Sequence, residues 1–239
     1  SWVRDGTVQA RVAYGNGPSD QSVAASTVFS KEADLGAAYL FNESTGDLLD
    51  VSGNNNDGAV TGATRGETGI VGSAYDFDGS DDIVNISNDA SIQFSGGDFT
   101  IILWAYAKDL SHTDYPALIG KRNDYDNMDW QIYDDGGSPT FSLGAQIDTR
   151  IIFSDATNEV NVWQTWTVVR RGDDHEFFRY GSHVQTQTAS SSFSDDQDLA
   201  IGDFEYNTSK NPWNGIIDCV RFHSTALPPD EITALYAPT

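Results

Sequence analysis

The residues best suited to chemistry in this chain are its carboxylates, several of which stand close together in the sequence. Two acidic clusters occur in turn-rich segments: Asp78, Asp81 and Asp82 in one, and Asp124, Asp126 and Asp129 in the other. Carboxylates in flexible turns suit calcium, which takes hard oxygen ligands. In the second cluster, however, Met128 breaks the Asp-x-Asp-x-Asp-Gly spacing, and no Glu follows at the twelfth position. We therefore expect both clusters to be solvated turns.

Signatures of nucleophilic or zinc-dependent catalysis are absent from the sequence. There is no Gly-x-Ser-x-Gly elbow. Metal-ligand spacing is also missing among the four histidines: His112, His175, His183 and His223. The single cysteine, Cys219, lies in the apolar run GIIDCVRF, which predicts a structural thiol in a strand. Arg171-Gly172-Asp173 spells an adhesion tripeptide but lies between two apolar runs, where Gly-Asp is ordinary turn chemistry.

The charge balance excludes several classes of partner. The chain carries 36 Asp and Glu against 13 Lys and Arg, a formal net charge of −23. Nucleic acids and anionic membranes are recognised by clusters of Lys and Arg, which this sequence lacks. Such an acidic surface repels itself in dilute salt, whereas at molar ionic strength the screening length falls to about 3 Å. The composition favours a salt-adapted source; the alternative is an Asp-rich extracellular β protein that collects divalent cations.

The periodicity of the chain is that of strands. Apolar runs rich in β-branched and aromatic residues recur about every ten positions, which is typical of an antiparallel sandwich or barrel. FTIILWAY is apolar on both faces and is expected to be a central strand. EFFRYGSHVQTQT predicts a hairpin with the two-residue turn Gly181-Ser182. LPPDEITALY predicts a short helix, because Pro229 suits the first turn and Asp230 and Glu231 complement the helix dipole.

The N-terminal segment has a different character. TVQARVAYGN predicts one strand, and the stretch that follows it is polar. We expect residues 1–33 to be the end of an upstream module with a linker, and residues 34–239 to be one domain. The N-terminus lacks an initiator Met and a signal-peptide core, and no apolar run approaches the roughly 20 residues that span a bilayer. The sequence therefore reads as a processed or excised piece.

From Leu35 to Tyr236 the order of motifs resembles the laminin-G-like, concanavalin A-like jelly-roll family. GAAYLFNESTGDLLDVSGNNNDGAV is similar to the family's aromatic strand and its Asp-x-Ser-Gly-Asn loop, and AYDFDGSDDIVNI to its Phe-Asp-Gly strand pair. DFTIILWAYAK and WNGIIDCVRFHSTALPPDEITALY are similar to its central strand, closing strand and capping helix. The resemblance implies an all-β, antiparallel jelly-roll sandwich with one short C-terminal helix. Residues Thr7 to Phe29 resemble the end of a domain of unknown function often found upstream of this jelly roll.

The resemblance also implies a structural Ca²⁺ ion, which family members hold with the Asp-x-Ser-Gly-Asn loop and the Asp of the last strand. Carried over to this chain, the metal ligands are Asp50, Asn56 and Asp218. Cys219 departs from the pattern, because relatives often have a second acidic residue there. The alternative for Asp50 and the following Asn residues is turn chemistry, in which side chains accept hydrogen bonds from nearby backbone N–H groups.

Enzymes and binding modules both occur on sandwiches of this kind. Retaining glycoside hydrolases with this sandwich carry Glu-x-Asp-x-x-Glu or a close variant, which places two carboxylates about 5 to 9 Å apart. No such string occurs here, so we expect a non-catalytic protein. Binding relatives use a sheet face or rim loops, where aromatic rings stack on sugars.

The candidate ligand-binding residues are Tyr125, Trp130, Tyr133 and Trp213, with core packing as the alternative. Core positions are expected for Trp104, Trp163 and Trp166. The sequence thus predicts a recognition or adhesion module that binds a glycan or a host or cell-surface protein, displayed outside a cell or virion. A structural or decoration subunit of a viral fibre or surface appendage, assembled as a homo-oligomer, is the alternative.

Overall fold

The computed structural model describes residues 34–111, 115–122, 128–143, 149–190, 195–203 and 211–236, and the backbone of two short strands, β1 (Val8–Gln9) and β2 (Val28–Phe29). These two strands pair antiparallel with each other, with Val8 opposite Phe29. The next strand, β3 (Leu35–Tyr39), starts just after the expected boundary at residue 33. The division into two units stays a prediction.

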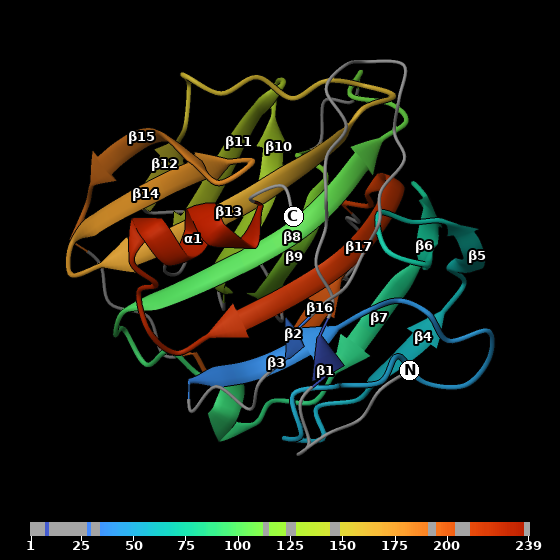
Figure 1. Ribbon diagram of the computed structural model, residues 1–239. Helices are drawn as coiled ribbons and strands as arrows, with labels where there is room; N and C mark the ends of the chain where they lie inside the picture. The colour runs from blue at the N-terminus through green and yellow to red at the C-terminus, as the bar shows by residue number, and fades with distance from the viewer. Residues whose placement is uncertain are drawn as a thin grey trace.

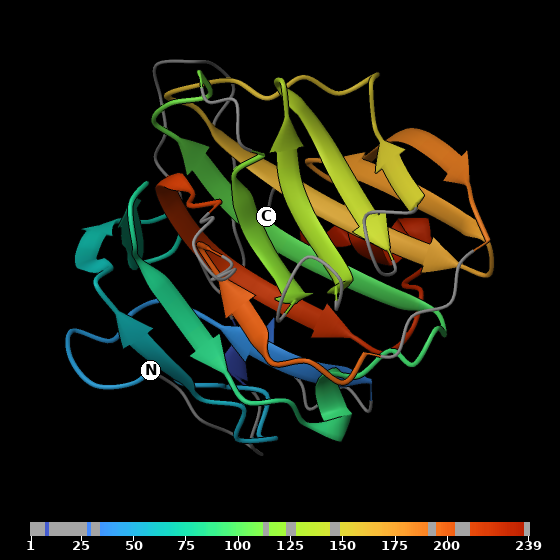
Figure 2. The same cartoon turned by 180° about the vertical axis from the view of Figure 1, so that it is seen from behind.

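Two antiparallel sheets form a sandwich (Figures 1 and 2). In spatial order, the seven-stranded sheet contains β12 (Thr149–Ile152), β11 (Ser138–Leu143), β10 (Met128–Asp135), β9 (Ala117–Arg122), β16 (Leu199–Ile201), β7 (Ile83–Ile86) and β4 (Gly58–Thr61). The eight-stranded sheet contains β15 (Ser182–Thr188), β14 (Asp174–Arg179), β13 (Trp163–Arg171), β8 (Phe99–Ala107), β17 (Asn214–His223), β6 (Ser73–Asp78) and β5 (Thr64–Thr68). Strand β3 pairs with the last part of β17. The predicted all-β antiparallel sandwich is confirmed.

The central strand β8 lies between β13 and β17, as its apolar sequence predicts. Side chains alternate along a strand, so its two faces serve two different cores. Phe99, Ile101 and Leu103 face the main core between the sheets. Ile102 and Trp104 face outward and belong to a second cluster.

The predicted helix is α1 (Pro229–Leu235), which covers part of the outer face of the eight-stranded sheet (Figure 1). Pro229 occupies the first turn, where its missing N–H costs nothing, and Asp230 also lies in that turn. Ile232 and Tyr236 pack over the sheet, and the Tyr236 ring lies 5.9 Å from that of Trp104. Among the described residues, no helix is long and apolar enough to cross a membrane.

The edge strand β5 was not predicted from the sequence. Its residues TRGET show no apolar alternation, because none of its side chains is buried. Arg65 anchors the strand: its Nη1 donates a hydrogen bond to the Tyr75 hydroxyl at 2.9 Å. An edge strand with one neighbour and no buried side chain leaves no hydrophobic pattern in the sequence.

The predicted hairpin is confirmed as β14 and β15, but its two-residue turn is Tyr180-Gly181, one residue earlier than the predicted Gly181-Ser182, because Arg179 pairs with Ser182. Both turn residues have left-handed φ angles, 52° and 77°. This is the conformation of the type I′ turn, which suits the twist of paired strands and favours Asn, Asp and Gly. A tyrosine in its first position is unusual.

A buried ion pair joins β9 to Asp195, which precedes β16 and also holds the segment after the short 3₁₀ helix η1 (Ala90–Ile92). Lys121 Nζ lies 3.0 Å from Asp195 Oδ1 and donates a hydrogen bond to Asn88 Oδ1 at 2.7 Å. Asp195 Oδ2 accepts from the backbone N–H of Phe94 and of Ser95. Burial lowers the pKa of Lys121 and raises the pKa of Asp195, and the attraction between the two charges opposes both effects.

Candidate functional site

Two predicted calcium ligands, Asp50 and Asn56, lie in the same loop, between β3 and β4. Asp50 Oδ1 accepts hydrogen bonds from the backbone N–H groups of Ala38 (3.0 Å) and Ser52 (2.9 Å). Its Oδ2 accepts from the Ser52 hydroxyl (2.8 Å) and from the Asn56 N–H (3.0 Å). A carboxylate offers about four lone-pair sites, so these bonds use its whole accepting capacity. The donor set of Asp50 fits turn chemistry, and a calcium ion there would displace hydrogen bonds.

Asn56 is a buried link between this loop and its neighbours. Its Nδ2 donates to the Gly36 carbonyl (2.9 Å) and to the Ser91 hydroxyl (2.8 Å). Its backbone carbonyl accepts from the Tyr39 hydroxyl at 2.7 Å. Gly36 is required by the close approach of the chain, because a Cβ there would lie 2.0 Å from the Ser91 carbonyl oxygen. Hydrogen bonds within the loop and from the loop to β3 and η1 thus hold it closed.

The third predicted ligand, Asp218, is fully buried at a bulge in β17. Its Oδ2 accepts hydrogen bonds from the backbone N–H groups of Ile70 (2.7 Å) and Val71 (3.1 Å), in the turn between β5 and β6. Burial raises the pKa of Asp218 to about 6. The described hydrogen bonds do not join Asp218 to Asp50 or Asn56, so calcium binding by these three residues stays a prediction.

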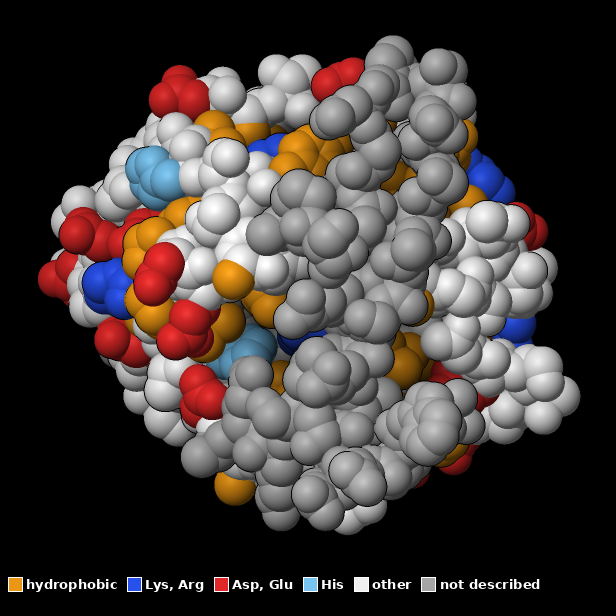
Figure 3. Space-filling view, viewed as in Figure 1, with side chains coloured by type: hydrophobic (Ala, Val, Ile, Leu, Met, Phe, Trp, Pro, Cys, Tyr) orange, Lys and Arg blue, Asp and Glu red, His pale blue; other side chains and the backbone are white. Residues whose placement is uncertain are grey.

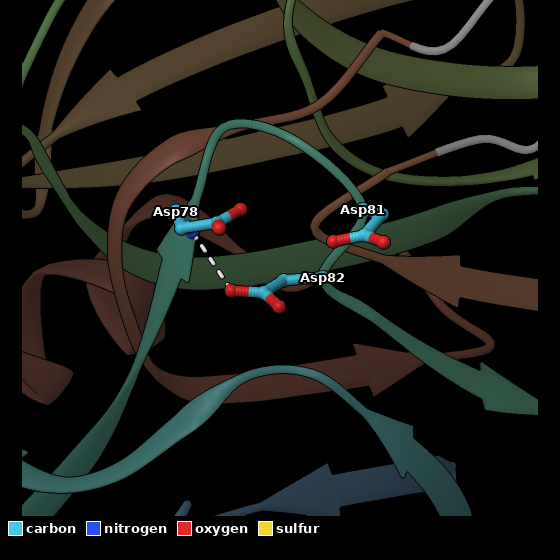
Figure 4. A group of neighbouring side chains, drawn as sticks. All are labelled: Asp78, Asp81 and Asp82. Carbon is cyan, nitrogen blue, oxygen red and sulfur yellow. Dashed lines mark hydrogen bonds between the residues drawn. The ribbon is translucent and has the colours of Figure 1, made fainter.

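A tighter group of carboxylates lies in the turn between β6 and β7 (Figure 4). One oxygen from each of Asp78, Asp81 and Asp82 lies within 4.8 Å of the others. The Asp78 N–H donates to Asp82 Oδ2 at 2.8 Å. Asp78 and Asp81 are exposed as expected, but Asp82 is buried, and burial together with the charges of its two neighbours raises its pKa. The cluster could therefore take up a proton or a cation.

The structure corrects two of the predicted ligand-binding residues. Trp130 and Trp213 are 0% and 1% exposed and belong to the core between the sheets. A ring packed by protein on both faces has none left for a sugar, so neither can serve as a stacking platform. Asp129, expected in a solvated loop, is a buried residue of β10 whose Oδ2 accepts from the Gln197 N–H at 3.1 Å. Tyr125 lies outside the described residues.

Tyr133, the remaining candidate, points to the outer face of the seven-stranded sheet, which faces the viewer in Figure 2. There it packs with Ile83, Ala117 and Ala200. A row of directly opposed residues crosses this sheet: Asn85, Ala200, Gly120, Gln131, Ser142 and Arg150. Opposed residues share a face, so this side of the sheet combines small and hydrogen-bonding side chains with the apolar cluster around Tyr133. Gln131 and Ser142 in this row are buried, so the parts of this side that a ligand can reach lie at its exposed residues.

Beside Tyr133 lies an exposed aromatic residue that was not predicted. The Tyr115 side chain is 43% exposed, and its ring meets the Tyr133 ring edge-on, with centroids 5.9 Å apart. The Arg150 guanidinium lies 5.2 Å from the Tyr115 ring centroid, and its Nε donates to the Tyr133 hydroxyl at 3.1 Å. The Ser142 hydroxyl also bonds that hydroxyl (3.0 Å), and Asp135 pairs with Arg150. We call Tyr115, Tyr133, Ser142, Asp135 and Arg150 the tyrosine–arginine cluster.

The surroundings of Tyr133 keep its hydroxyl neutral. Burial is the main cause that raises the pKa of Tyr133, although Ser142 and Arg150 act in the opposite direction. Tyr133 therefore stays protonated at neutral pH and can both donate and accept hydrogen bonds. The cluster offers an exposed ring, a guanidinium and a carboxylate within one small area. Its members come from three strands and one connecting segment, and a single signal could have marked Tyr115: an aromatic residue in the polar stretch SHTDYP.

Comparison with known proteins places this geometry in a family context. The family described as the concanavalin A-like lectin/glucanases superfamily matches residues 78–233. A comparison with curated protein sequences finds no match.

Several solved structures share the fold. The binding domain of Paraclostridial Mosquitocidal Protein 1 superposes with a TM-score of 0.70 at 19% identity, over 87% of this chain and 52% of that one. Domain 4 of AbnA, a GH43 extracellular arabinanase from Geobacillus stearothermophilus solved in complex with arabinotriose, has a TM-score of 0.67 at 18% identity, over 85% and 98%. The receptor binding domain of botulinum neurotoxin C/D mosaic serotype has a TM-score of 0.66 at 16% identity, over 85% and 51%. This chain spans about half the length of the two toxin domains, and at these identities the likeness shows the fold alone.

Proposed function

Given that the chain belongs to the concanavalin A-like lectin/glucanases superfamily, we propose that it is a non-catalytic module that binds carbohydrate at the tyrosine–arginine cluster, on the outer side of its seven-stranded sheet. The observation that carries the proposal is the exposed ring of Tyr115, held between Tyr133 and Arg150. Aromatic rings stack on the apolar faces of sugars, and neighbouring polar groups bond the hydroxyls. The arabinotriose complex of AbnA domain 4 and the receptor binding domains of the toxins support a binding role by analogy of fold.

The backbone at Tyr115 supports the same proposal. Its φ angle is 50°, a left-handed conformation that is an outlier for a bulky side chain and costs about 1–3 kcal/mol. The Asn211 side chain helps to hold the segment, because its Nδ2 donates to the Tyr115 carbonyl at 3.2 Å. Strain of this kind persists where the surrounding structure compensates for it, and it clusters at binding sites. Here it places an aromatic ring in solvent.

Affinity electrophoresis in native gels containing arabinan, xylan or glucomannan tests the proposal, with the protein and gels held at fixed salt. Tyr115→Ala should raise the dissociation constant obtained from the retardation about tenfold, because the loss of roughly 1.4 kcal/mol of stacking energy corresponds to that factor. Leu49→Ala, which truncates an exposed apolar side chain elsewhere, is the matched control and should bind like the wild type. Equal retardation of the wild type and Tyr115→Ala would contradict this site, and release of reducing ends would contradict a non-catalytic role.

The wider setting that we propose is display outside a cell or virion of a salt-adapted source, with a glycan or cell-surface protein as partner. The net charge of −23 supports a salt-adapted source, because high ionic strength screens the repulsion between the carboxylates of the protein. The fibre-subunit alternative requires a symmetric oligomer, which sedimentation velocity in molar NaCl would detect.

A structural calcium ion at Asp50, Asn56 and Asp218 remains a proposal of its own, supported by the resemblance of the loop and the last strand to the family pattern. If it is bound, a chelator lowers the melting temperature and Asp218→Ala removes the difference. An unchanged melting temperature in chelator would contradict it and leave the hydrogen-bonded loop as the whole role of Asp50.

A further inference from the structure

Three exposed hydrophobic residues lie around the end of β8 and the start of β13, in the sheet that does not contain the tyrosine–arginine cluster. They are Val160, Val162 and Tyr180, which are 44%, 38% and 40% exposed. Two half-buried aromatic residues join them: Tyr106 and Trp163 are direct cross-strand partners whose ring centroids lie 5.7 Å apart. The Tyr180 hydroxyl donates to the Trp163 carbonyl at 2.7 Å. We call these five residues the rim patch; Figure 3 shows hydrophobic side chains exposed on this face of the molecule.

The Tyr106 and Trp163 rings of the rim patch lie on the opposite side of the sandwich from the tyrosine–arginine cluster. Along β8, residues 99, 101 and 103 face the core, so Tyr106 faces outward, like Trp104. Trp163 packs against the outer cluster under helix α1. The segment before Trp163 is held to β8, because the Asn161 N–H donates to the Ala107 carbonyl at 2.8 Å.

The rings of the rim patch are held in place before any partner arrives. The Tyr180 N–H donates to Thr165 Oγ1 at 2.6 Å, and its ring lies 6.0 Å from that of Trp104. The Tyr106 hydroxyl donates to Asn161 Oδ1 at 3.4 Å. A surface whose side chains are already ordered loses little conformational entropy on binding.

The tyrosine at position 180 strains the backbone of its turn, although the turn could form without strain with another residue there. The first position of a type I′ turn favours Asn, Asp or Gly, and a bulky residue with a φ of 52° costs about 1–3 kcal/mol. Gly181 in the second position meets the conformational demand without strain. The same combination of left-handed backbone and exposed tyrosine occurs at Tyr115.

We propose that the rim patch is a second carbohydrate-stacking surface, so that one chain binds neutral polysaccharide on both faces of its sandwich. The ligand class rests on the proposed function, but the site is separate and is tested separately. Tyr106, Trp163 and Tyr180 supply the rings, while the Asn161 side chain and the tyrosine hydroxyls supply polar contacts at their edges. Two sites on one chain raise the apparent affinity for a polymer without any new contact, because the second binding event becomes intramolecular.

The size of the rim patch and its lack of charged side chains favour a neutral sugar over a protein partner. A stable protein interface buries about 800 Å² on each partner and engages roughly 20–30 residues, whereas the patch has five side chains. A few sugar rings match the patch in area and, like the patch, carry no charge.

Tryptophan fluorescence gives a direct readout of this site. Trp163 is half-buried, whereas Trp104, Trp130, Trp166 and Trp213 are at most 3% exposed. Trp2 lies outside the described residues, so the experiment uses a Trp2→Phe background. Acrylamide quenching is measured with and without arabinan, xylan or glucomannan. Bound polysaccharide should protect Trp163 from acrylamide in the parent protein and in Tyr115→Ala.

The decisive variant is Tyr180→Asn, which removes the ring and places a residue that the turn prefers. It should weaken the polysaccharide protection of Trp163 about tenfold while the melting temperature stays equal or rises, so that misfolding cannot explain the loss. Val51→Ala, at an exposed apolar position elsewhere, is the matched control and should leave the protection unchanged.

The possible outcomes separate the two sites. Polysaccharide binding that is lost in Tyr115→Ala, with no protection of Trp163 and no effect of Tyr180→Asn, overturns the rim patch and leaves the proposed function intact. Binding that depends on Tyr180 alone supports the rim patch and overturns the proposed face. Absence of binding to every polysaccharide overturns both. A dimer in sedimentation velocity that Tyr180→Asn dissociates would show a contact between copies instead.

Discussion

Titration of His175 is expected to set much of the acid sensitivity of this protein. The side chain is fully buried on the inner face of β14, with its ring 5.8 Å from that of Phe141. Burial, followed by the charge of Arg170, lowers the pKa of His175 from 6.5 to about 4. The unfolded chain therefore binds a proton more readily than the folded protein between these two pH values. Stability due to the neutral ring is complete above pH 6.5 and is lost as the pH falls toward 4.

The magnitude follows from the width of this window. Each pH unit between 6.5 and about 4 changes the free energy of unfolding by about 1.4 kcal/mol for one histidine. Over the whole window the loss of stability is about 3 kcal/mol. Asp218 acts in the opposite sense, because burial raises its pKa to about 6 and the folded protein binds that proton more tightly. The total pH profile is thus a composite, and His175 is isolated by comparing variants.

Urea unfolding at constant ionic strength, measured from pH 7 to pH 4, provides the assay. His175→Leu keeps an apolar side chain in the core and should lose about 3 kcal/mol less stability over this range than the wild type. His183→Leu is the matched control, because His183 is exposed on β15, and it should follow the wild-type profile. Parallel profiles for wild type and His175→Leu would refute the reasoning and show that His175 is not the group that titrates.

Three further perturbations test the fold and its charge. Lys121→Met leaves Asp195 buried without its partner and should lower the free energy of unfolding, measured in urea, by about 3–5 kcal/mol. Adding Asp195→Asn should restore part of that stability. A loss below about 1 kcal/mol would show that water reaches the pair. Gly202→Ala places a Cβ 2.1 Å from the Phe77 ring at a residue with a φ of 90°. It should lower the free energy of unfolding by about 2 kcal/mol more than Gly136→Ala, where no atom lies within 4 Å of the added Cβ. Equal losses of stability in the two variants would mean that the Phe77 ring moves aside. Molar NaCl should raise the melting temperature well above that in dilute buffer, and identical melting in the two would argue against salt adaptation.

Local sequence determines the secondary structure of this protein closely. Strand β8, helix α1 and the β14–β15 hairpin follow from apolar alternation, a proline with acidic neighbours, and a turn glycine. Each of these signals is encoded within about ten residues, so no distant partner is needed to recognise it. Strand β5 escaped prediction because an exposed edge strand carries no apolar pattern. The order of motifs along the chain also indicates the family.

The binding surfaces, by contrast, were decided by the tertiary structure. Trp130 and Tyr133 lie on the same strand, yet one ring is in the core and the other on the outer face. Which face of a strand is buried depends on the sheet that packs against it, and alternation alone does not reveal it when both faces are apolar. Tyr115 and Arg150 meet only because strand pairing brings their segments together. No single stretch of sequence determines which distant strands pair or in what register. The grouping of the exposed rings is therefore set only when both sheets have formed.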